Sequence, residues 1–433
     1  MSQLRGQLIQ MLTLAAELEH MLCCSYLFAA FSTKRSGEDF AGHANPTPRD
    51  FEHASLVINW TQSVSFVARQ EMEHLALVNN ILMAIGGAPH FRQPNFPFPE
   101  RHFGMRLTLE PLSLPVIERF VAFERPEDLR HSPPVSIANQ VGDPTSPTPV
   151  FFKSFGALYA QIRATLVAFP GPDEALFVGP RQAQVDGAQL NLDFPRLGKL
   201  GGVYGITIFP ITDRASAIRA IDLIVEQGEG GPPLSDDDAD YEADHHARFL
   251  AIKAEMEALL SEHDDFAPAH NVLPNPVLYI EEAPPGANRV SAEPARRVMD
   301  LFNAAYEMTL RLLTQLYAGA HSDPAEASAL RYAAFFPMMT MVIRPLGEIL
   351  VTLPAQDPDD GTRAGPSFEA YTSLSVVSDA ATSRIVLQEF FDDMADKGAR
   401  LATQDIHPRL AYVAESLALI AARFRQMTMP GGQ

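Results

Sequence analysis

One long segment constrains the fold of this chain more than any other. Residues 54–86 are expected to form a single helix, and at about 100° per residue Glu71 and His74 share its apolar stripe. The other members of that stripe are Val64, Val67, Val78, Ile81, Leu82 and Ile85, whereas Glu73 points away. Burying a carboxylate and an imidazole costs several kcal/mol unless a partner offsets it, so the rest of the chain must supply one.

The composition indicates a soluble globular protein. Of the 433 residues, 46% are hydrophobic and 20% charged, and no run approaches the roughly 18 apolar residues of a membrane span. The first residues lack the features of a signal peptide, and adjacent Cys23 and Cys24 point in different directions on a helix, so they are expected to be reduced thiols of a cytoplasmic protein. The net charge of −20 disfavours nucleic acid and anionic membranes as partners.

Two helical units are predicted. The first, residues 1–265, is a bundle with a long irregular insertion at about 88–212, where proline-rich connections are dense. The second, residues 290–428, is a C-terminal helical subdomain packed on that bundle. The helices are expected at about 5–33, 54–86, 151–168, 213–229, 239–262, 292–318, 324–351, 366–400 and 408–427.

A second Glu-x-x-His pair, Glu242 and His245, shares an apolar stripe in the same way as Glu71 and His74. Its stripe contains Phe249, Ile252, Met256 and Leu260. A third pair, Glu17 and His20, lies off the stripe of the first helix and is expected at the surface.

Single carboxylates complete the pattern. On the first helix the buried acid is expected to be Glu19, with Tyr26 two turns further along the same face. In residues 213–229 the stripe ends at Glu229, which is favoured over Glu226, although neighbouring glycines weaken the helix there.

These residues predict a dinuclear metal site. Four carboxylates and two neutral imidazoles balance two divalent cations, and such ligands suit iron or manganese. A Glu from each of two helices and a Glu-x-x-His from each of two others is the ligand set of di-iron carboxylate bundles. The predicted fold is therefore all-α, a four-helix bundle. The alternatives are buried Glu–His ion pairs, acids paired with arginines, or a partly degenerate site with one metal.

The motifs resemble the ferritin-like superfamily. "LEHMLCCSY" is similar to the bacterioferritin pattern of a ligand Glu followed by a Tyr seven residues on. "ARQEMEHLALVNNILMAIGGAP" resembles the ferritin-like domain of iminophenyl-pyruvate dimer synthases, as do "VEQGEGG" with "ADHHARFLAI", "FFPMMTMVIRPLGEILVTLP" and "GTRAGPSFE". The resemblance spans about residues 1–370. It implies that the metal ligands are Glu19, Glu71, His74, Glu229, Glu242 and His245.

The first functional hypothesis is a di-iron, or di-manganese, oxidase or oxygenase that acts on a small organic molecule with O₂. Tyr26 can donate a hydrogen bond or an electron near the metals, and Arg344 can anchor a substrate carboxylate. The alternative for Tyr26 is a core tyrosine with a satisfied hydroxyl, and the alternative for Arg344 is an i,i+4 contact with Glu348 or a surface position. A non-catalytic metal-binding scaffold, a biosynthetic accessory protein and a peroxide or metal detoxification protein are the other hypotheses. A homodimer is compatible with the sequence.

Overall fold

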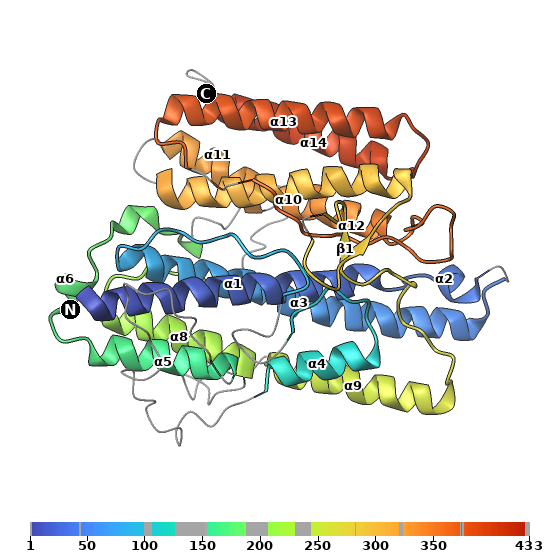
Figure 1. The fold of residues 1–433 in the computed structure, drawn as a ribbon, viewed down its shortest axis with the longest axis horizontal. Coiled ribbons are helices and arrows are strands. Elements are labelled where there is room, and N and C mark those ends of the chain that lie inside the picture. Colours follow the sequence, from blue (N-terminus) through green and yellow to red (C-terminus); the bar gives the residue numbers. More distant parts are fainter. Residues whose placement is uncertain are drawn as a thin grey trace.

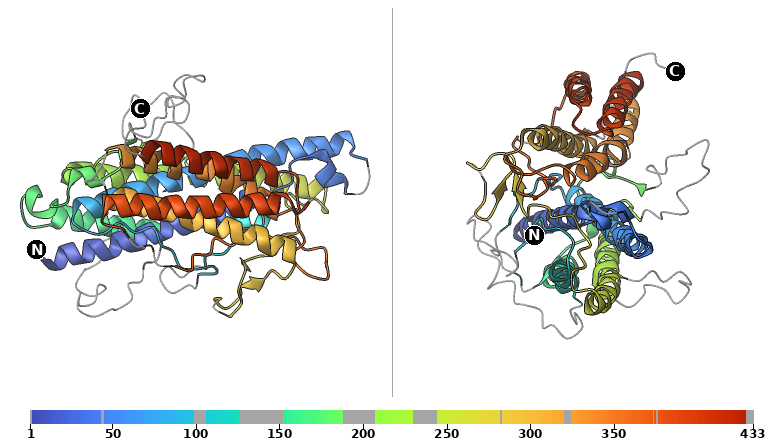
Figure 2. Two further views of the ribbon diagram at one scale, coloured as in Figure 1. Left: turned by 90° about the horizontal axis from the view of Figure 1, so that it is seen from above. Right: turned by 90° about the vertical axis from the view of Figure 1, so that its right-hand side faces the viewer.

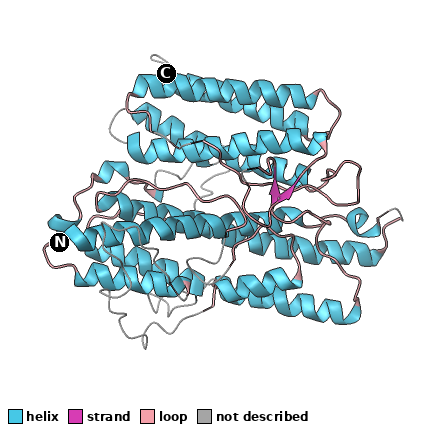
Figure 3. Ribbon diagram, in the orientation of Figure 1, coloured by secondary structure: helices cyan, strands magenta, loops and turns pink. Residues whose placement is uncertain are grey.

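The computed structural model describes residues 2–42, 45–98, 106–125, 152, 154–187, 207–229, 244–281, 283–319, 324–335, 337–372, 374 and 376–428. Within these ranges the protein is mainly helical, and its strands β1 (Pro276–Val277) and β2 (Asn288–Arg289) form a small parallel sheet (Figure 3). The long helices run along one common axis, so the molecule is elongated (Figure 1).

Two long helices form the middle layer of the molecule. Helix α1 (Ser2–Ser32) and helix α3 (Pro48–Ala84) pack against each other along their length, with the short α2 (Gly37–Ala41) at the turn between them. Thr47 begins α3 with a capping box, in which Thr47 and Asp50 satisfy each other's backbone N–H groups, and Pro48 occupies the first helical position. The capping box and Pro48 together determine where α3 starts.

The lower layer contains four shorter helices arranged as two interrupted rods. Helices α4 (Leu114–Phe123) and α5 (Phe155–Ala168) lie end to end, and so do α8 (Arg214–Glu229) and α9 (His245–Glu262) (Figure 1). Helix α4 packs against α9, and α5 packs against α8. With α1 and α3, the two rods form a four-helix bundle, in which the α3–α4 connection returns along the bundle as one long crossover. Two short helices, α6 (Asp173–Leu176) and η2 (Arg181–Ala183), lie between α5 and α8.

The C-terminal helices form the upper layer, on the opposite side of α1 and α3 from the two rods (Figures 1 and 2). They are α10 (Glu293–Gly319), α11 (Pro324–Phe335), the π-helix η4 (Pro337–Ile343), α12 (Arg344–Leu350), α13 (Ala380–Ala402) and α14 (Leu410–Thr428). One continuous hydrophobic core includes side chains of all three layers. Helix α1 is consequently buried on both sides.

Most predicted helices are present with shifted ends, but three regions differ. Within the range 88–212, expected to be an irregular insertion, the helix expected at 151–168 is present as α5, but α4 was not predicted, and both helices belong to the bundle itself. The helix expected at 324–351 changes to a π-helix at Pro337, and the one expected at 366–400 begins only at Ala380. In the expected range before Ala380, Phe368 has a positive φ of 49°, and Glu369 accepts hydrogen bonds from the Leu278 backbone N–H and the Asn303 amide.

One helix, Gln3–Ser32, is long and apolar enough to cross a membrane, but 83% of its apolar window is buried inside the protein. Its apolar residues therefore form part of the core that lies between the layers.

We expect Gly347→Ala to destabilise the contact between the C-terminal helices and the bundle. A Cβ atom at Gly347 would lie 2.6 Å from Cδ2 of Phe31 in α1. Overpacking of this kind costs about 1–3 kcal/mol, measurable as a lower free energy of unfolding in urea. Gly398→Ala is the control, because its Cβ meets the mobile end of Leu417 at 3.0 Å within the α13–α14 hairpin. Equal stability of both variants would contradict close packing at Gly347.

Candidate metal centre

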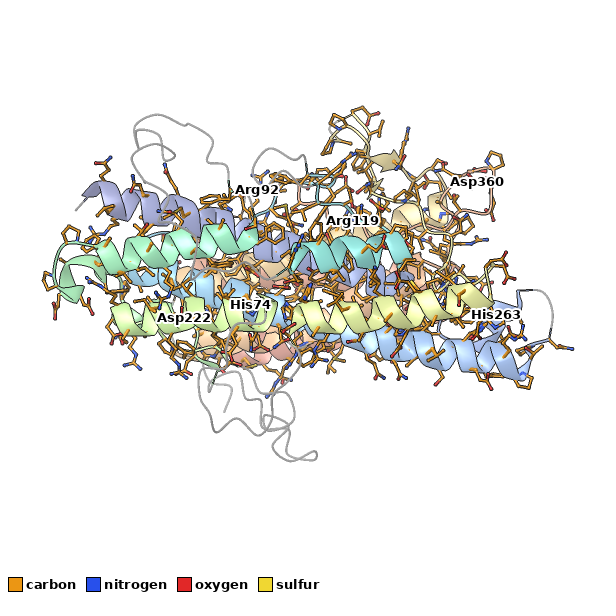
Figure 4. All side chains as sticks on the ribbon, turned by 90° about the horizontal axis from the view of Figure 1, so that it is seen from below. His74, Arg92, Arg119, Asp222, His263 and Asp360 are labelled. Carbon is orange, nitrogen blue, oxygen red and sulfur yellow. The ribbon has the colours of Figure 1, made fainter. Side chains whose placement is uncertain are left out.

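Five buried ligand-type side chains meet in the middle of the bundle. Glu19 comes from α1, Glu71 and His74 from α3, Glu124 from the C-terminal cap of α4 and His245 from the first turn of α9. None is more than 5% exposed. Figure 4 places His74 at the level where α8 ends and α9 begins. The break between α4 and α5 and the break between α8 and α9 therefore lie at the same position along the bundle axis as this cluster.

The five side chains form two groups that share one carboxylate. In the first group, His74 Nδ1 lies 3.1 Å from Glu71 Oε2 and 3.4 Å from Glu19 Oε2. In the second, His245 Nδ1 lies 3.2 Å from Glu71 Oε1 and 3.5 Å from Glu124 Oε2. The ligand atoms of each group lie within 4.8 Å of one another. Glu71 thus offers one oxygen to each group, as a bridging ligand of two metal ions does.

A glutamine holds the outer nitrogen of each histidine. His74 Nε2 lies 2.9 Å from Gln227 Oε1, and His245 Nε2 lies 3.1 Å from Gln70 Oε1. An amide oxygen can only accept, so each Nε2 carries a proton, and in the neutral imidazole each Nδ1 has its lone pair available for a metal. Both imidazoles are therefore oriented for binding through Nδ1.

A tyrosine donates to each terminal carboxylate. The Tyr159 hydroxyl donates to Glu19 Oε1, and the Tyr26 hydroxyl donates to Glu124 Oε1. In each case the other carboxylate oxygen, Oε2, is the one that faces the histidine. The two halves of the centre therefore have the same design: a carboxylate held by a phenol, a histidine held by a glutamine, and one oxygen of Glu71.

Burial and mutual repulsion strongly perturb the acids and bases of the metal-free cluster. Burial and the charge of Glu71 raise the pKa of Glu19 to about 8, and the same two causes raise the pKa of Glu124. Burial alone would raise the pKa of Glu71 as well, but His245 and His74 hold it below its usual range. The pKa of His245 rises to about 9, because Glu71 and Glu124 outweigh the effect of burial. In the metal-free cluster, protons bound to Glu19 and His245 therefore offset the negative charge that metal ions would otherwise balance.

The donor set fits two divalent metal ions. Glu19 Oε2, Glu71 Oε1 and His245 Nδ1 are buried without a hydrogen-bond partner, and all three face the space between the ligands. Among the described side chains, the ion pairs of these carboxylates are with His74 and His245 only, so pairing with arginine does not account for their burial. Three carboxylates against two imidazoles leave a negative surplus that suits iron or manganese.

The structure brings together four of the six predicted ligands: Glu19, Glu71, His74 and His245. Glu242 and the side chain of Glu229 lie outside the described residues, so both remain predictions; Glu226 is half-buried. Predicted Tyr26 lies beside the centre through Glu124.

Predicted Arg344 lies elsewhere. It makes the i,i+4 contact with Glu348 at 2.9 Å, and its side chain is 62% exposed. Glu348 also binds Arg35, which follows the end of α1, about 18 Å or more along that helix from Glu19. This position matches the alternative interpretation of Arg344, an i,i+4 contact at the surface, and its role in anchoring a substrate carboxylate stays a prediction.

Sequence reasoning missed Glu124, Tyr159 and the two glutamines. Glu124 continues the apolar stripe of Ile117 and Phe120 at spacings of three and four, which is the same signal that identified Glu19. The dense prolines of the range 88–212 indicate an irregular segment, and this signal conceals the helical periodicity of residues 117–124. The prediction of a surface position for His20 is wrong: His20 is buried, because α10 of the upper layer covers that face of α1.

Comparisons with known proteins agree with the helical fold. The model of the family described as "Ferritin-like" matches residues 12–254, more than half of the chain. The chain therefore belongs to the ferritin-like family.

Its curated relatives are larger enzymes. The chain is 30% identical to a dichlorochromopyrrolate synthase of Lentzea aerocolonigenes over 96% of its own length and 41% of that protein. It is 31% identical to a 2-imino-3-(indol-3-yl)propanoate dimerase of Chromobacterium violaceum over 69% of its own length and 26% of that protein. These matches confirm the resemblance to the dimer synthases, although the chain spans less than half the length of either relative.

A solved structure of a ferritin-like protein from Caulobacter vibrioides is also similar. It is 19% identical in sequence, covers 75% of this chain and 93% of its own, and has a TM-score of 0.41. This is a weak similarity.

We expect the bound-metal count to depend on which carboxylate is removed. Glu71→Gln should lose both metal ions, because Glu71 serves both groups, whereas Glu124→Gln should lose only the ion of the second group and Glu19→Gln only that of the first. Metal content by mass spectrometry, after loading with Fe²⁺ without oxygen, measures this. Glu17→Gln is the control, since Glu17 lies on the same helix but pairs with His90. A full metal count in Glu71→Gln would exclude the bridging role.

Metal affinity should rise with pH. Protons and metal ions compete for the same atoms, so binding is weak where Glu19 and His245 are protonated. Their pKa values of about 8 and about 9 place the increase on the alkaline side of neutrality. Isothermal titration with Co²⁺ in buffers of different ionisation enthalpy measures both the affinity and the protons released. Binding without proton release near neutral pH would contradict this assignment.

Proposed function

We propose that the protein is a dinuclear non-haem iron or manganese enzyme, an oxidase or oxygenase of a small organic substrate that uses O₂. The observation that carries this proposal is the sharing of buried Glu71 between two matched groups of ligands. The names of its relatives, a synthase and a dimerase, support a biosynthetic enzyme. The free thiols of the buried Cys23 and Cys24 support the cytoplasm as its location.

Within this proposal, the bound metal ions supply the redox chemistry with O₂, and the protein supplies geometry and proton control. Glu71 would hold both ions, one by each carboxylate oxygen, while Gln227 and Gln70 favour the histidine tautomer that would ligate through Nδ1. Tyr159 and Tyr26 hold protons at their phenol oxygens, in contact with Glu19 and Glu124. The apolar surroundings exclude bulk water, which strengthens each of these interactions.

The net charge of −20 disfavours nucleic acid and anionic membranes, and the proposed reaction requires a small molecule and O₂ as partners. A homodimer is compatible with this function.

A second candidate function is a metal-binding scaffold or biosynthetic accessory protein without catalysis. The near-complete burial of all five ligand side chains favours it, because a catalytic centre must also admit a substrate. The chain spans 41% of one relative and 26% of the other, so their activities come to this chain only as proposals.

Oxygen uptake by the iron-loaded protein separates the two functions. The enzyme proposal predicts that protein loaded with Fe²⁺ without oxygen consumes O₂ in proportion to its iron. Glu71→Gln should lose this uptake, and the control Glu17→Gln should retain it. Two tightly bound irons that do not react with O₂ would favour the scaffold, and absence of bound iron and manganese would overturn both.

A further inference from the structure

A second buried polar cluster joins the C-terminal helices to α1 beside the metal centre. It consists of His20 and Cys24 of α1, Gln93 of the crossover and Tyr306 of α10, and we refer to it as the seam cluster. The Tyr306 hydroxyl lies 2.9 Å from His20 Nε2 and accepts a hydrogen bond of 2.9 Å from Gln93 Nε2. Cys24 Sγ lies 3.8 Å from the same hydroxyl and 3.4 Å from Gln93 Nε2.

Every member of the seam cluster is at most 5% exposed. The phenol oxygen of Tyr306 accepts from Gln93, so its own proton is available for His20 Nε2. Without that hydroxyl, His20 Nε2 would lose this partner while buried, at a cost of about 1–3 kcal/mol, and Gln93 Nε2 would keep only the weak acceptor Cys24 Sγ. The Tyr306 hydroxyl therefore stabilises the observed orientation of the His20 side chain and contributes to that of Gln93.

The seam cluster lies directly beside a predicted metal ligand. His20 follows Glu19, so their Cα atoms are about 3.8 Å apart on one rigid helix. A helix turns as a unit, and fixing the His20 side chain on one face therefore fixes the direction of Glu19 on the neighbouring face. No hydrogen bond or ion pair found among the described residues joins the seam cluster to Glu71, Glu124 or His245.

We propose that Tyr306 is a positioning residue for the first metal position: through His20 it holds α1 so that Glu19 faces Glu71 and His74. The inference rests on the dinuclear centre of the proposed function. It assigns to the C-terminal helices a specific task, the positioning of one of the two terminal carboxylates.

The test is Tyr306→Phe, which removes only the hydroxyl. The first position is measured alone in Glu124→Gln, and the second alone in Glu19→Gln, by anaerobic titration with Co²⁺ followed by its absorption spectrum. We expect Tyr306→Phe to weaken the first position about tenfold, at the lower end of the range for residues that orient metal ligands. The second position should keep its affinity.

Thr309→Val is the matched control. Thr309 is buried on the same helix, one turn after Tyr306, but its hydroxyl donates to Ala305 within α10. We expect it to leave both positions unchanged. A double-mutant cycle with His20→Leu should be non-additive for the first position, because both changes break one hydrogen bond.

The outcomes separate this inference from the proposed function. If the wild type binds no metal, the proposed function fails. If it binds two ions and Tyr306→Phe leaves both affinities unchanged, or lowers both equally, the positioning role is overturned while the metal centre remains. A loss of unfolding free energy without a change at the first position would make the seam cluster a packing contact only.

Discussion

The structure depends on one carboxylate that contacts two histidines. Glu71 presents Oε2 to His74 and Oε1 to His245, and these residues come from helices on different layers of the bundle. A buried carboxylate of this kind is unfavourable alone, and it is tolerated only where positive charge surrounds it. Protonated histidines supply that charge in the metal-free cluster, and two metal ions would supply more. The convergence of α1, α3, α4 and α9 on one point follows from this requirement.

The bundle differs from four uninterrupted helices at the level of the cluster. Helix α4 ends at Glu124, and α9 begins at His245 after Asp244, whose side chain accepts the Ala247 N–H as a helix cap. Both ligands therefore occupy helix termini, where the backbone can turn away from the bundle axis.

Periodicity predicted much of the fold and four of the five ligand-type side chains that meet in the centre. Glu19, Glu71, His74 and His245 were found because each continues an apolar stripe on a long helix without breakers. Glu124 was missed for a physical reason: α4 is short and lies between proline-rich segments, so local breakers obscured a stripe that tertiary packing stabilises. His20 was misplaced because α1 is covered from two sides (Figure 2), and a helix buried all round has no single stripe to separate inside from outside. Orienting partners such as Gln227 and Tyr159 depend on contacts between distant segments, which periodicity does not report.

The central claim, that Glu71 bridges two metal ions, is tested most directly by anomalous X-ray diffraction from crystals grown with Fe²⁺ and measured at the iron edge. The account predicts two anomalous peaks about 3.5–4 Å apart, the spacing of two-metal sites, with one carboxylate oxygen of Glu71 on each. The first peak should also contact His74 Nδ1 and Glu19, and the second His245 Nδ1 and Glu124. A single peak, or two peaks that Glu71 does not join, would contradict the account.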